Sequence, residues 1–106
     1  MHDKIRLSRD AAEFLRREAN YIRSRNPAAA LAFGRMAKDV QATLRSFPQS
    51  GNRMHGTFIP QSRTIVRGDY LWTYIVHGEF IDILAIRHGR MPDSSPKTDS
   101  ADSLTD

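Results

Sequence analysis

The 106-residue sequence has no cysteine, a single tryptophan and no long apolar run. Without cysteine the chain can form neither a disulfide framework nor a thiolate metal site or nucleophile, which fits a reducing cytoplasm. The first ten residues are charged and no apolar stretch follows them. We therefore expect neither a standard secretion signal nor a membrane span, and we predict a cytoplasmic protein.

Several motifs that hold ligands are also missing. The glycine patterns that cradle nucleotides, Gly-x-x-x-x-Gly-Lys and Gly-x-Gly-x-x-Gly, do not occur. Glu79 and Asp82 lie on or beside a predicted hairpin turn, where they more often solubilise a strand edge than act as paired catalytic carboxylates. The four histidines of the sequence are His2, His55, His77 and His88. They show no His-x-x-x-His or similar ligand spacing, so we expect no metal site and no cofactor.

Charge is unevenly distributed along the chain. The net charge is +4, and the segment from Asp93 to Asp106 contributes −3 through four aspartates and one lysine, so the rest carries +7. A basic body indicates an acidic partner, either nucleic acid or an acidic protein segment, although many basic surfaces are only solvated. The C-terminal segment is rich in Ser, Asp, Thr and Pro, and we predict one domain over residues 1–92 followed by a disordered acidic tail over 93–106.

The first half of the chain predicts a short strand and two helices. Lys4 to Leu7 alternates polar and apolar residues, and Ser8 is a good N-cap for a helix from about Arg9 to Arg23. Asn26-Pro27 then begins a second helix, which Pro48 stops. Because only residues 24–26 separate the helices, we expect an antiparallel helical hairpin. Residues 49–61 are expected to form a surface loop.

Residues 62–90 predict a three-stranded antiparallel meander, because turn signals at Gly68-Asp69 and at residues 77–79 separate three β-rich runs. The fold class is therefore α+β, with the helical hairpin packed on the meander. In the middle run both faces are largely apolar, so one face should cover the hairpin and the other should be exposed unless a partner lies on it. Tyr70, Trp72, Tyr74 and Val76 lie on one face, and Leu71, Thr73 and Ile75 on the other.

A set of residues along the chain recurs in the same order in a known family. They are Leu7-Ser8, Ala11, Leu15, Tyr21-Ile22, Asn26 to Ala30, Phe33, Leu44, Phe47-Pro48, Gly51, Arg63, Tyr70, Tyr74, Ile83-Leu84 and Arg87 to Arg90. Together with the order of strand, helical hairpin and meander, this set resembles the RelE/ParE superfamily of bacterial type II toxins, and it is closest to the ParE branch. Phe14 departs from the resemblance because the family usually has an acidic residue there. Glu18 departs because the family usually has an aliphatic one, and the acidic tail has no expected counterpart.

The resemblance implies a toxin that is held inactive by an antitoxin encoded beside it, with a role such as plasmid stabilisation. ParE-like members act on DNA gyrase without an enzymatic step, whereas RelE-like members are ribosome-dependent mRNA endonucleases. For a nuclease, His88 would be the general acid or base, and Arg67 and Arg87 would stabilise the phosphate. The residues after the last strand, 91–94, include no tyrosine, which favours the gyrase inhibitor. A third alternative is a basic interaction module without toxicity.

Two binding surfaces follow as hypotheses. The first is a target-binding surface at the end of the meander, where arginines could bind phosphate or acidic groups. The second is an apolar antitoxin-binding groove on the surface that the hairpin and sheet leave open. We predict Arg63, Arg67, Arg87, His88 and Arg90 for target binding, and Tyr21, Phe33, Leu71 and Trp72 for antitoxin binding.

Overall fold

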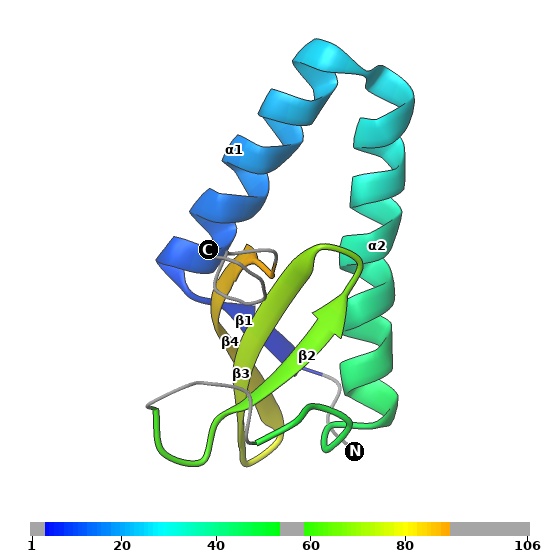
Figure 1. Ribbon diagram of the computed structural model, residues 1–106. Coiled ribbons are helices and arrows are strands. Elements are labelled where there is room, and N and C mark those ends of the chain that lie inside the picture. The colour runs from blue at the N-terminus through cyan, green and yellow to red at the C-terminus, as the bar shows by residue number, and fades with distance from the viewer. Residues whose placement is uncertain (1–3, 54–58, 90–106) are drawn as a thin grey trace, which may run out of the picture.

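The computed structural model describes residues 4–53 and 59–89, and Figure 1 shows how they are arranged. The helices join at one end of the molecule and spread apart toward the sheet, which lies between their other ends (Figure 1). The predicted α+β class is confirmed. The elements are β1 (Lys4–Leu7), α1 (Arg9–Arg25), α2 (Pro27–Ser46), β2 (Arg63–Arg67), β3 (Tyr70–His77) and β4 (Phe80–His88).

Local capping signals set the helix boundaries. The Ser8 hydroxyl accepts a hydrogen bond from the Ala11 amide at 3.0 Å and donates to the Leu84 carbonyl at 2.8 Å, so it caps α1 and ties it to β4. Asn26 alone separates the helices, because its amide closes α1 while its side chain caps α2 through the Ala29 amide. The predicted connection of three residues is therefore two residues too long, and α1 continues to Arg25.

The sheet has four strands in the order β1-β4-β3-β2. β2, β3 and β4 form the predicted antiparallel meander. The sequence predicted the N-terminal strand β1 but not the strand with which it pairs. β1 pairs in parallel with β4, from Lys4 opposite Phe80 to Leu7 opposite Ile83. The register of β3 against β4 shifts between Thr73 and Tyr74. The sheet is therefore mixed, with β1 and β2 as its edges.

One sheet face packs against both helices and forms the core. Trp72 and Tyr74 are fully buried there, together with Ala11 of α1 and Val40 and Leu44 of α2. On the opposite face Thr73 is also buried, and its hydroxyl lies 3.1 Å from that of Thr64. The sheet face that carries Thr73 is therefore less exposed than the sequence predicted for the face that the helices do not cover. Leu71 and Ile75 on that face are partly exposed.

Three predictions lie wholly or partly outside the described residues. Arg90 and the acidic tail over 93–106 are not among residues 4–53 and 59–89. The same holds for residues 54–58 of the predicted surface loop. At the described end of this loop, Asn52 pairs with Thr64 of β2 in an isolated antiparallel bridge.

Candidate functional site

One end of the sheet brings the β2–β3 turn and the end of β4 together. Tyr70 at the start of β3 is opposite Arg67 of β2 on one side and His88 of β4 on the other. The Gly89 amide donates to the Asp69 carbonyl at 2.6 Å, which joins the turn to the end of β4. We call Arg67, Arg87 and His88 the basic rim. Three of the five predicted target-binding residues therefore lie at the same end of the sheet.

Arg63 does not belong to the basic rim. It begins β2, whereas Arg67 ends this strand, so the two arginines are roughly 13 Å apart along the strand. The Arg63 guanidinium donates to the carbonyls of Gln49 at 3.2 Å and Gly51 at 3.0 Å. It therefore holds the segment that follows α2 against the sheet. Arg90 lies outside the described residues.

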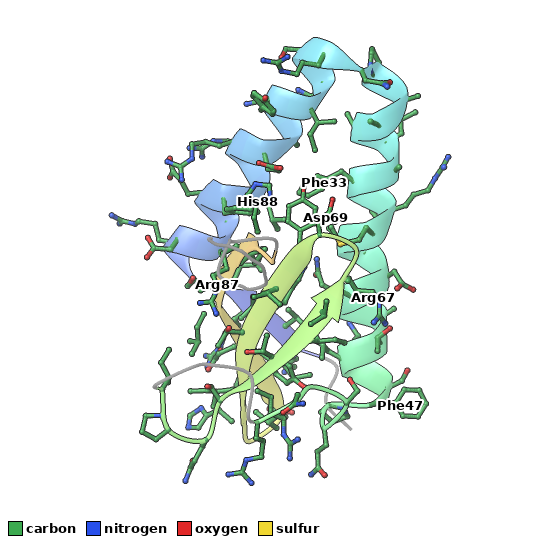
Figure 2. All side chains as sticks on the ribbon, in the orientation of Figure 1. Phe33, Phe47, Arg67, Asp69, Arg87 and His88 are labelled. Carbon is green, nitrogen blue, oxygen red and sulfur yellow. The ribbon has the colours of Figure 1, made fainter. Side chains whose placement is uncertain are left out.

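Arg67 and Arg87 present their charges in different directions. Arg67 is bound to α2, because its Nε lies 3.1 Å from Asp39 Oδ2 and its Nη2 lies 3.0 Å from Thr43 Oγ1. Figure 2 likewise shows Arg67 lying against α2. Arg87 is exposed, and because it directly precedes His88 in β4, the two side chains point to opposite faces of the sheet. The three rim side chains therefore do not converge on a common point.

His88 belongs to a half-buried cluster that the sequence did not predict. Glu18 of α1 accepts a hydrogen bond of 2.6 Å from the Tyr70 hydroxyl, and its Oε2 also lies 3.3 Å from Nε2 of His88. The side chain of Glu18 is only 15% exposed. Burial and the hydrogen bond to this carboxylate raise the pKa of Tyr70. We call Glu18, Tyr70 and His88 the carboxylate cluster.

Aromatic rings surround the carboxylate cluster. The Tyr70 ring lies 5.1 Å from His88, 6.0 Å from Phe14 and 5.2 Å from Phe33, measured between ring centroids. Phe33 and His88 lie in the space between the two helices in Figure 2. Phe14 and Glu18 are the two positions that depart from the toxin resemblance, and their spacing of four residues places them on one face of α1. The sequence signal for this cluster is the spacing of four residues between Phe14 and Glu18, which indicates that both side chains face the same neighbours.

The four residues predicted for antitoxin binding do not lie on one surface. Trp72 is fully buried in the core, so in this conformation its side chain offers no area to a partner. Phe33 is 7% exposed and packs on Tyr70, whereas Leu71 points to the opposite sheet face. Tyr21 is 56% exposed, and its ring lies 4.7 Å from the Arg25 guanidinium.

Metal-binding and membrane-spanning features were sought over residues 4–53 and 59–89. No three Asp, Glu or His side chains in these ranges are grouped as a metal ion would require. His2 and His55 are outside these ranges. No helix in the described part of the chain has the length and apolar character needed to cross a membrane.

Comparisons with known proteins agree with this architecture. A chain of the chromosomal ParDE TA system from P. aeruginosa has a similar fold, with a TM-score of 0.64 and 22% sequence identity. The match covers 80% of this chain and 94% of that chain. No curated protein matches the sequence. A family model described as the ParE toxin of the type II toxin-antitoxin system parDE matches residues 5–92, and the chain therefore belongs to the ParE toxin family.

Proposed function

We propose that this ParE-family toxin acts in the cytoplasm by binding DNA gyrase through the basic rim, and that a cognate antitoxin neutralises it. One observation supports binding over catalysis. Arg67 is already paired with Asp39 and His88 with Glu18, while Arg87 faces the other side of the sheet. RNA cleavage needs an acid–base group and cations that converge on one phosphate. A protein surface, in contrast, can be bound by charges spread over a rim.

The mRNA endonuclease remains the second candidate. Residues 91–94 after β4 include no tyrosine, but the fold places Tyr70 of β3 beside His88. The Tyr70 hydroxyl, however, donates to the Glu18 carboxylate, and its raised pKa makes it a poor proton donor to a leaving group at neutral pH. The same carboxylate contacts the His88 imidazole. This arrangement favours a structural role for both side chains. A basic interaction module without toxicity is the third alternative.

The experiment expresses the chain in a permissive bacterial host, with and without the antitoxin encoded in the neighbouring reading frame. A gyrase inhibitor should arrest growth, induce DNA-damage signalling and trap cleaved gyrase complexes while total messenger stays intact. Messenger cut within codons on the ribosome would support the nuclease instead. If the host grows normally although the protein is folded, the result would support the third alternative, a basic interaction module without toxicity.

Three single variants separate binding from proton transfer. Arg87→Ala should weaken growth arrest, since it removes an exposed rim cation, whereas Arg17→Ala removes an exposed cation from α1 and serves as the matched control. His88→Gln should have a small effect, because an amide can still donate a hydrogen bond to Glu18. A loss of activity of a hundredfold or more in His88→Gln, about the size expected for a lost acid–base group, would contradict the binding mechanism.

A further inference from the structure

The outer face of α1 carries a row of arginines. Arg9, Arg16 and Arg23 are exposed and stand seven residues apart. Because seven residues make almost two helical turns, the three side chains lie on one face of α1 at intervals of about 10.5 Å along the axis. Asn20 lies on the same face between the second and third arginines. We call Arg9, Arg16 and Arg23 the arginine row.

The arginine row faces away from the rest of the molecule. The opposite side of α1 packs Ala11 and Leu15 against the core. Figure 1 shows α1 along one side of the molecule, with α2 and the sheet both on its other side. Within residues 4–53 and 59–89, the arginine row is therefore open to a partner.

The positive charge of the arginine row is only partly compensated. Arg16 Nη2 lies 2.8 Å from Glu13 Oε2, and a surface pair of this kind contributes at most about 1 kcal/mol. Arg23 donates to the Asn20 side-chain oxygen at 2.7 Å, but an amide carries no net charge. In the described part of the chain no carboxylate pairs with Arg9 or Arg23. Arg9 also begins α1, where the helix dipole disfavours a cation, so helix stability does not explain it.

The composition of this face fits a polyanion better than the surface of a folded protein. Protein interfaces are centred on apolar and aromatic side chains, whereas the other exposed positions on this face are Ala12, Asn20 and Ser24. A solvated helix face usually alternates opposite charges three or four residues apart, whereas here like charges recur every seven residues. Arginine and asparagine side chains both bind phosphate oxygens of nucleic acids.

We propose that the arginine row binds the phosphate backbone of duplex DNA without reading its sequence. The row spans about 21 Å, a length over which one DNA strand carries about six phosphates. Contacts to phosphates position a protein on the duplex but carry no sequence information. The choice of DNA over RNA rests on the proposed function, because DNA gyrase acts on DNA. The row then contacts that DNA while the basic rim binds the enzyme.

The test compares two triple variants that have the same net charge. The first changes all three arginines of the row to glutamine, and the second changes Arg35, Lys38 and Arg45, which are exposed on α2, to glutamine. Glutamine is a good helix former, so both variants should keep their helices, and circular dichroism checks this. Binding to a fluorescent DNA duplex of mixed sequence is measured by anisotropy at several salt concentrations.

The row variant should bind the duplex at least tenfold more weakly at the lowest salt, and the α2 variant less than threefold more weakly. Each lost phosphate contact lowers the slope of log affinity against log salt by about 0.9, so the row variant should lose about 2.7 from this slope. Equal effects of the two variants would show that only net charge matters and would overturn the proposal. Failure of the unchanged protein to bind the duplex would overturn it as well.

A single change gives a test in the opposite direction, which also decides if the row variant does not fold. Glu13→Gln removes the carboxylate that pairs with Arg16, so it should strengthen DNA binding about twofold or more. Glu79→Gln makes the same change of charge at an exposed position beyond β3 and is the matched control. Equal affinities of these two variants would contradict a role of the arginine row.

Two other probes distinguish the alternative partners. Polyglutamate represents an acidic protein segment, and if the row variant loses binding to polyglutamate but not to DNA, the proposal is wrong. Tighter, row-dependent binding of an RNA duplex of the same length would overturn the choice of DNA and count against the proposed function. All of these measurements are made without gyrase. A failure to trap gyrase complexes in cells, with DNA binding through the row intact, therefore counts against the proposed function alone.

Discussion

Removal of the Tyr70 hydroxyl tests whether the carboxylate cluster holds α1 to the end of the sheet. In Tyr70→Phe the ring keeps its contacts with Phe14, Phe33 and His88, so only the 2.6 Å hydrogen bond to Glu18 is lost. A hydrogen bond to a charged group contributes about 1.5–3 kcal/mol. Because Glu18 keeps His88 as a partner at 3.3 Å, we expect the lower part of this range, about 1.5–2 kcal/mol.

The assay is urea and thermal unfolding at pH 7, followed by circular dichroism. For a domain of this size a loss of 1.5 kcal/mol lowers the thermal midpoint by about 6 °C or more. The control is Tyr21→Phe, since Tyr21 is 56% exposed and its change should stay within about 0.5 kcal/mol. If Tyr70→Phe costs no more than this control, the Tyr70 hydroxyl does not hold α1 to the sheet.

The pH dependence of the same pair of proteins provides a second check. The pKa of Tyr70 is raised in the folded protein, whereas the unfolded chain titrates near about 10. A raised pKa means that the folded state holds the Tyr70 proton more tightly than the unfolded chain does. The contribution of Tyr70 to stability is therefore full below the pKa of the unfolded chain, and it declines as the pH rises toward the pKa of the folded protein. The stability difference between the unchanged protein and Tyr70→Phe should therefore shrink above about pH 10. Tyr74, whose pKa burial also raises, is present in both proteins and cancels.

Two further predictions concern the loop after α2 and the β1–β4 pair. Gly51→Ala should destabilise the protein by about 1–3 kcal/mol in urea unfolding, because the added Cβ would lie 2.7 Å from the Tyr74 hydroxyl. Gly34→Ala is the control: Gly34 lies on α2 with open space around it, so this change should be neutral or stabilising. The hydrogen bond from Arg6 lowers the pKa of Asp82, so the stability lost in Asp82→Asn should be present at pH 7 and vanish as acid titration passes below about pH 4. A pH-independent difference would contradict the second prediction.

Signals that act over a few residues were sufficient to predict the helices. Ser8 and Asn26 cap the helices through atoms only three positions away, so neither depends on the tertiary fold. The turn at Gly68-Asp69 is equally local, and Gly68 has the positive φ of 56° that this turn requires. These features predicted the order of the elements. The parallel pairing of β1 with β4 depends on residues more than 70 positions apart, and no local pattern specifies it.

The arrangement of the candidate site residues was harder to predict than the strands that carry them. Trp72 was assigned to a partner surface because β3 is apolar on both faces, and the pattern alone does not say which face the helices cover. Arg63 was grouped with the rim although it stands four positions from Arg67, a spacing that separates them along an extended strand. Glu18 was recognised only as a departure in helix packing. Its partners Tyr70 and His88 are 52 and 70 positions away, so only the folded chain brings them together.

The different environments of the rim residues determine how their variants can be interpreted. Arg67 supports the contact between β2 and α2, and His88 contacts the carboxylate cluster, so changes at either residue alter stability as well as the surface. A loss of toxicity in those variants therefore needs an accompanying unfolding measurement before it is assigned to the target. Arg87 is exposed, and no ion pair or side-chain hydrogen bond holds it within the described part of the chain. Its alanine variant should keep the stability of the unchanged protein within about 0.5 kcal/mol, so any loss of growth arrest there reports on target binding itself.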